Sequence, residues 1–142
     1  MNPARANYET IPSSVGKTRV QTGVRWGLSL LFVTAGAFHF VNPNIFLSIV
    51  PPWLPFPLEA VYLSGVAEIA GGLMLLWPKS RNLGVLELTL LLLAVFPANI
   101  QMLLEAEKYS FPAWILWARL PLQPVLIALL WWSSWEARKV NS

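Results

Sequence analysis

Four apolar segments, separated by short polar or proline-rich stretches, dominate the hydrophobic pattern of this chain. They cover about residues 23–41, 60–77, 83–104 and 120–135. A straight membrane-spanning helix needs about 20 apolar residues, within a range of roughly 17–25. The first three segments fit that range, and the fourth fits it if residues 114–118 join it. The pattern therefore predicts an all-α integral membrane protein built as an antiparallel four-helix bundle.

The connections between the segments agree with this count. Asn42, Pro43 and Asn44 end the first segment, and the four prolines of residues 51–57 exclude a regular helix there. Because residues 46–56 are too apolar for a free loop, we expect them to lie along the membrane surface. The polar turn that follows Trp77 is short enough to make the second and third segments an antiparallel hairpin.

Composition supports a membrane location. Hydrophobic residues make up 56% of the chain and charged residues 12%, whereas a soluble domain carries roughly twice that share of charge. Eight Lys and Arg residues lie near the start of the first segment, in the middle turn or after the fourth segment, against two in the other connections. Cytoplasmic loops carry the excess of basic residues, so both termini are expected in the cytoplasm.

This topology divides the chain into three parts. We expect a flexible cytoplasmic tail over residues 1–19, a four-helix transmembrane domain over 20–136 and a basic cytoplasmic tail over 137–142. A cleaved signal peptide is the alternative for the first segment, with Ala35-Gly36-Ala37 as the cleavage site. The apolar stretch continues to Val41, which favours a retained span.

Residue usage excludes several chemistries. Cysteine is absent and histidine occurs once, which rules out disulfides, thiolate metal sites, cysteine nucleophiles and histidine-rich metal clusters. No metal site and no covalently bound cofactor is expected. The basic residues flank apolar segments and form no patch, so the lipid bilayer is the expected partner and nucleic acid is not.

Polar side chains inside apolar segments are the candidate functional residues, because each is costly in lipid. The topology places five of them at similar depth in the outer half of the membrane: His39, Glu68, Asn99, Arg119 and Gln123. Small residues one turn before and after Glu68 indicate that this side chain faces another helix. We expect Glu68 and Arg119 to form a charge pair, completed by His39 and Gln123. The cluster is either a ligand-binding site or structural glue, and no catalytic residue is assigned.

Three other residues carry separate expectations. Glu87 should form an ion pair at the inner interface with Lys79 or Arg81. Pro97 should kink the third helix. Pro121 should occupy the first position of the fourth helix.

Five separated strings of residues occur in an order that resembles the DoxX-like family of small four-helix membrane proteins. The strings are Gly36-Ala37-Phe38-His39-Phe40-x-x-Pro43, Ile49-Val50-Pro51-Pro52-x-Leu54-Pro55, Leu63-Ser64-Gly65-x-x-Glu68-x-x-Gly71-Gly72, Val95-Phe96-Pro97-Ala98-Asn99-Ile100 and Arg119-Leu120-Pro121-Leu122-Gln123. The resemblance covers about residues 24–132. It implies a bacterial cytoplasmic membrane and an association with oxidoreductase systems or with the assembly of membrane proteins. Quinone is then the candidate cofactor.

Two functions of different kinds remain open, and so does the question of whether the protein is an enzyme. The first is a quinone- or small-lipid-binding accessory subunit of a membrane oxidoreductase system, which requires a ligand-sized cavity. The alternative is a non-catalytic assembly or stability factor for a membrane protein complex, which predicts a filled core. A membrane oxidoreductase subunit and further copies of this chain, as a homo-oligomer, are the candidate protein partners. A transporter is less favoured, since four helices without inverted repeats leave a small pathway.

Overall fold

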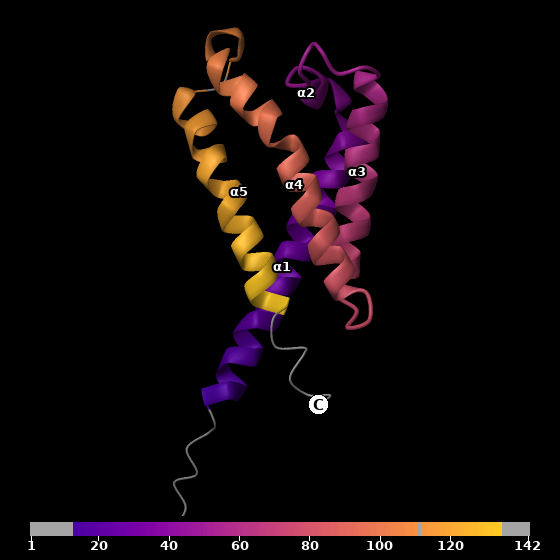
Figure 1. The fold of residues 1–142 in the computed structure, drawn as a ribbon, viewed down its shortest axis with the longest axis vertical. Helices are drawn as coiled ribbons and strands as arrows, with labels where there is room; N and C mark the ends of the chain where they lie inside the picture. Colours follow the sequence, from indigo (N-terminus) through magenta and orange to yellow (C-terminus); the bar gives the residue numbers. More distant parts are fainter. Residues whose placement is uncertain (1–12, 111, 135–142) are drawn as a thin grey trace, which may run out of the picture.

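The computed structural model describes residues 13–110 and 112–134, and every regular element in these ranges is helical (Figure 1). In chain order the elements are α1 (Ser13–Val41), α2 (Pro43–Leu47), α3 (Pro57–Met74), α4 (Arg81–Leu104), the 3₁₀ helix η2 (Ala106–Lys108) and α5 (Ala113–Ser134). The four long helices run alternately up and down, so each is antiparallel to the next long helix in the chain (Figure 1). The all-α prediction is confirmed for this part of the chain.

The expected tail over residues 1–19 is wrong for its last seven residues. Helix α1 begins at Ser13, ten residues before the predicted start at residue 23. No proline occurs between Pro12 and Pro43, so nothing in the sequence interrupts a helix that extends past the apolar segment. The first part of the predicted tail and the predicted basic tail over residues 137–142 lie outside the described residues.

Helix α3 is shifted by three residues relative to the predicted 60–77. Pro57 occupies its first turn, where a missing N–H costs nothing. The preceding Phe56 has a left-handed backbone with φ 55°, which turns the chain sharply into the helix. At the other end the helix stops at Met74, whose carbonyl accepts a hydrogen bond from the Ser80 hydroxyl at 3.1 Å.

Helix α5 begins at Ala113, seven residues before the predicted start at residue 120. Residues 114–118 therefore belong to it, as the apolar pattern had left open. The expectation that Pro121 occupies the first helical position is wrong, because Pro121 and Pro124 both lie inside the helix. Apolar residues continue on the N-terminal side of Pro121, and they extend the helix despite the two hydrogen bonds that the prolines remove.

Among the described residues, three helices are long and apolar enough to cross a membrane: Thr18–Val41, Arg81–Leu104 and Ala113–Ser134. Helix α3 is not among them, because its 18 residues include Glu59 and Glu68. Large apolar side chains face outward along the middle of all four long helices, among them Leu30, Leu31, Leu63, Val66, Leu90, Leu93, Leu122 and Val125. Outward apolar surface of this extent belongs in lipid, since water would strongly disfavour it. The chain is therefore a membrane protein.

Small residues set the contact between α1 and α3. A methyl group on Gly36 would lie 2.6 Å from the Gly65 carbonyl oxygen, and one on Gly72 would lie 3.1 Å from the Ser29 carbonyl oxygen. The two helices thus approach backbone to backbone at points about two turns apart. Lipid offers no hydrophobic drive for helix association, so close packing at small residues supplies much of the attraction.

The other contacts join the remaining helices. Gly84 of α4 packs against Met74 and Gly71 at the end of α3. The start of α1 lies beside the end of α5, where the Gln21 amide donates to the Trp132 carbonyl and the Arg25 guanidinium to the Ser133 carbonyl, each at 3.0 Å. These donors satisfy carbonyls that have no partner within the helix. A core of buried apolar side chains fills the space between them: Leu28, Phe32, Leu75, Val85, Leu88, Leu92 and Leu130.

Candidate functional site

A cavity of about 210 Å³ lies between the helices, at the end of the molecule occupied by α2. Its lining comes from α1, residues 46–54, α3, α4 and α5. At this end α4 and α5 lean away from α1 and α3 (Figure 1). Four of the five predicted site residues line the cavity: His39, Glu68, Asn99 and Arg119. Most of the other lining residues are apolar.

His39 and Glu68 form one wall of the cavity. The glycine contact between α1 and α3 brings them together, since a methyl group on Gly65 would meet the His39 Cβ at 2.7 Å and one on Gly36 would meet the Glu68 Cβ at 3.0 Å. The His39 Nδ1 lies 3.6 Å from the Glu68 Oε2 and 2.9 Å from the Ala35 carbonyl oxygen. Because a carbonyl only accepts, Nδ1 carries the hydrogen and donates it to Ala35.

The His39 ring is also fixed from the side of α2. Phe46 stacks on it with ring centroids 3.7 Å apart and an interplanar angle of 20°. His39 is buried, and the ring is held by this stack and the Ala35 hydrogen bond together. Both contacts fix the position of the His39 ring in this wall.

Arg119 and Asn99 belong to the opposite wall, on α5 and α4. The expected charge pair between Glu68 and Arg119 is not formed. The Arg119 Nη1 instead lies 3.9 Å from the Met102 sulfur, and Glu68 faces His39. The reason is the register of α1 against α3, which holds Glu68 on the α1 side of the cavity, whereas Arg119 extends from α5.

Gln123 does not line the cavity. It lies one turn after Arg119 on α5 and is buried, and its Nε2 donates to the Leu92 carbonyl at 3.2 Å. Its Oε1 is buried without a hydrogen-bond partner. Gln123 therefore joins α5 to α4, and its hydrogen bond goes to Leu92 and not to His39 or Glu68 as the predicted cluster required.

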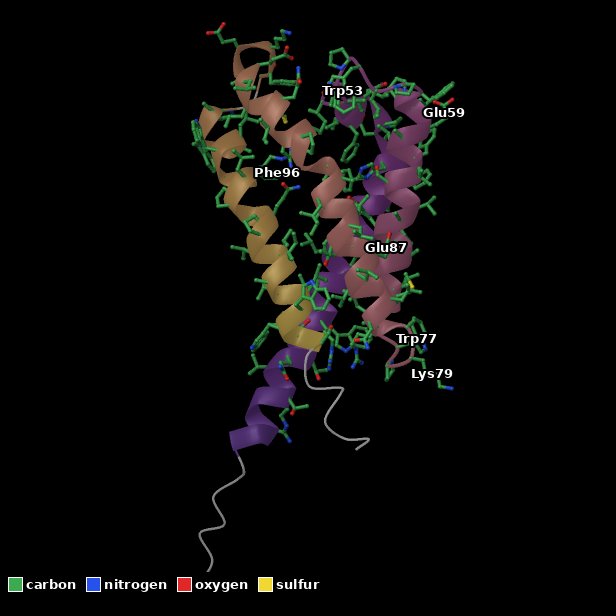
Figure 2. The ribbon with its side chains drawn as sticks, viewed as in Figure 1. Trp53, Glu59, Trp77, Lys79, Glu87 and Phe96 are labelled. Atoms are coloured by element: carbon green, nitrogen blue, oxygen red, sulfur yellow. The ribbon has the colours of Figure 1, made fainter. Side chains whose placement is uncertain are left out.

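The expected ion pair of Glu87 with Lys79 or Arg81 is also wrong. The Arg81 Nε donates to the Leu75 carbonyl at 3.2 Å, and Figure 2 shows Glu87 well away from Lys79, partway along α4. The Glu87 carboxylate instead packs against Gly71 of α3, where a methyl group would collide with it. Its Oε2 is buried without a hydrogen-bond partner. Gly71 leaves the space that this carboxylate occupies.

Residues 46–54 are the part of the site that the sequence did not predict. Phe46, Pro51, Trp53 and Leu54 line the cavity, and Figure 2 shows Trp53 at the end of the molecule where α2 lies. The segment is joined to the connection between α4 and α5 by the Tyr109 hydroxyl, which donates to the Ser48 carbonyl at 2.9 Å. The apolar composition of this segment is the available signal, and it fits a cavity lining as well as a membrane surface.

The chain is thus a helical membrane protein with a cavity between its helices, at the end of the molecule where α2 lies. Polar and apolar side chains both line this cavity. A family model matches residues 28–134, that of a domain of unknown function (DUF8561). The chain belongs to this family. The resemblance to the DoxX-like family is wrong, because that family gives no match. No curated protein and no solved structure matches the chain.

Proposed function

We propose that this protein crosses the membrane four times, with both termini in the cytoplasm, and binds a quinone or small lipid in its cavity. The distribution of Lys and Arg supports the orientation, since the residues near the start of α1 and in the turn before α4 lie at the end of the molecule opposite α2. The cavity then lies in the outer half of the membrane. Helix α3 crosses as the fourth span despite its two acids, because Glu68 faces α1 and not lipid.

The single observation that carries the binding function is the composition of the cavity. Small-molecule sites are mostly apolar, with a few polar groups that fix the orientation of the ligand. Here Val61, Leu54 and Val95 supply apolar surface, while Asn99 and Arg119 supply donors. The alternative function, an assembly or stability factor, predicts a filled core in this region and gains no support from a cavity.

The oxidoreductase partner and the bacterial cytoplasmic membrane are not retained. Only the DoxX-like resemblance suggested them, and that resemblance is wrong. The proposal is therefore limited to binding.

Filling the cavity tests this function. Ala98 lines the cavity on α4, and Ala128 is exposed on α5 away from it. We expect Ala98→Trp to remove the amphipathic molecules that co-purify with the protein in mild detergent, and Ala128→Trp to leave them bound. Native mass spectrometry measures both. The same bound molecules on Ala98→Trp as on the parent protein would refute a ligand site in the cavity.

A further inference from the structure

Arg119 is a half-buried cation without a counter-anion in the described part of the chain. Its guanidinium contacts the Met102 sulfur at 3.9 Å, and a thioether is only a weak acceptor. Among the described residues, Lys108 and Glu105 form an ion pair and the His39 ring lies 3.6 Å from Glu68, and neither contact includes Arg119. A charge removed from water is unfavourable unless it is paired. Because Arg119 lies on the cavity wall, we expect a group inside the cavity to accept the hydrogen bonds that its guanidinium can donate.

The acid of the cavity does not satisfy this cation. Glu68 is held beside His39 by the close approach of Gly36 and Gly65. Both helices meet there through backbone and Cβ atoms, which cannot rotate away. The cavity thus has a carboxylate–histidine pair on the α1–α3 wall and a separate guanidinium on the α4–α5 wall, with open volume between them.

The apolar residues of the lining indicate which chemical group the rest of a ligand should carry. The segment between α2 and α3 lines the cavity with Ile49, Val50, Trp53 and Leu54. Alkyl chains bind favourably to apolar surface of this kind. A volume of about 210 Å³ is smaller than the roughly 300–1,000 Å³ of a site that encloses a drug-sized molecule. It holds a small head and the first part of a tail, and the rest of the tail must extend into lipid.

We propose that the cavity binds a single-chain amphiphile with a carboxylate head, such as a fatty acid, and that this carboxylate pairs with Arg119. A planar guanidinium donates two parallel hydrogen bonds to a carboxylate, which gives both strength and orientation. The proposal rests on the proposed binding function and selects a small anionic lipid over a quinone, whose head is neutral.

The test compares three probes that share an oleyl tail and differ in the head, together with a quinone. The full-length protein in nanodiscs of neutral phosphatidylcholine is titrated with oleate, oleyl alcohol, oleyl phosphate and decylubiquinone. We expect oleate to bind at least tenfold more tightly than oleyl alcohol, decylubiquinone or oleyl phosphate. Arg119→Gln should remove that advantage while leaving the affinity for oleyl alcohol unchanged.

A matched variant separates the site from the general attraction of basic residues for anions. Arg81→Gln removes a cation at the other end of α4, where Arg81 bonds a backbone carbonyl, and should leave oleate binding unchanged. If Arg119→Gln does not fold, Arg119→Lys keeps the charge without the two parallel donors and should weaken oleate binding by a smaller factor. Thermal unfolding of each variant establishes that it is folded.

The outcomes distinguish this inference from the proposed function. Equal affinity for oleate and oleyl alcohol, with both excluded by Ala98→Trp, would overturn the carboxylate assignment and leave the binding function standing. Tighter binding of oleyl phosphate or of decylubiquinone than of oleate would also overturn the assignment. Binding of none of the four probes would overturn both.

Discussion

Substitution of Gly36 by alanine tests the contact that organises this fold. The new methyl group would lie 2.6 Å from the Gly65 carbonyl oxygen, 2.8 Å from the Ile69 Cγ1 and 3.0 Å from the Glu68 Cβ. Two of these neighbours are a backbone oxygen and a Cβ, which cannot move by rotating a side chain. Helices α1 and α3 must therefore separate by several tenths of an ångström.

The size of the effect follows from two opposing contributions. Overpacking of a well-packed interior costs typically about 1–3 kcal/mol. Replacing a helical glycine by alanine returns roughly 0.5–1 kcal/mol of backbone entropy and propensity. The difference between these ranges is about 0–2.5 kcal/mol, so we expect Gly36→Ala to lower the free energy of unfolding by about 1 kcal/mol.

Gly23 provides the matched control on the same helix. A methyl group there would meet nothing within 4 Å, so Gly23→Ala should be neutral or stabilising by up to roughly 1 kcal/mol. Reversible unfolding from detergent micelles with increasing sodium dodecyl sulfate measures both variants. Equal or greater stability of Gly36→Ala compared with Gly23→Ala would refute the close approach of α1 and α3.

Two further predictions concern single side chains. Gln123→Leu removes one hydrogen bond to α4 together with an unpartnered buried oxygen, so the stability should change by less than about 1 kcal/mol; a loss of more than twice that in the same unfolding assay would show that the amide holds the two helices together. Hydrogen bonding to Glu105 raises the pKa of Lys108, so Glu105→Gln should lower that pKa toward its ordinary value in an NMR titration. Lys108 is fully exposed, so the midpoint of unfolding at neutral pH should not move, and an unchanged Lys108 pKa would contradict the hydrogen bond.

Much of the helical architecture could be predicted from the hydrophobic pattern, and so could the wall positions of the cavity. Each apolar segment corresponds to one of the long helices, within a few residues at both ends for 60–77 and 83–104, because a run of apolar residues of that length has few other conformations in a membrane. Alternating helix directions then bring His39, Glu68, Asn99 and Arg119 to similar depth. These four residues line one cavity for that reason.

The pairing of these residues could not be predicted in the same way. Depth along the membrane is fixed by distance from a helix end, but the partner of Glu68 depends on rotation and on the distance between helix axes. Both are set by the meeting of Gly36 with Gly65, a contact between residues far apart in the sequence. Charge and depth alone favour Arg119 as the partner of Glu68, whereas helix packing places Glu68 beside His39.

The resemblance to another family failed for a related reason. Its strings include small residues around a half-buried acid, such as Gly65, Glu68 and Gly71, and prolines within or between helices. Closely packed helices in lipid need these residue types whatever their ancestry. Their occurrence in order therefore indicates helix packing more than descent.

The two walls of the cavity differ in how readily they can adjust to a ligand. The α1–α3 wall is held by backbone contact at Gly36 and Gly65, whereas the α4–α5 wall contains Pro97, Pro121 and Pro124 inside its helices. Each of these prolines removes a hydrogen bond to the carbonyl four residues earlier, which weakens the helix at that point. Pro97 and Pro121 lie on the half of α4 and α5 near the cavity, Pro124 lies at the middle of α5, and Arg119 extends from this weakened wall. For the proposed anionic ligand, the His39–Glu68 wall is therefore the one held by backbone contact, and the wall that carries Arg119 is the one whose helices lack backbone hydrogen bonds at the prolines.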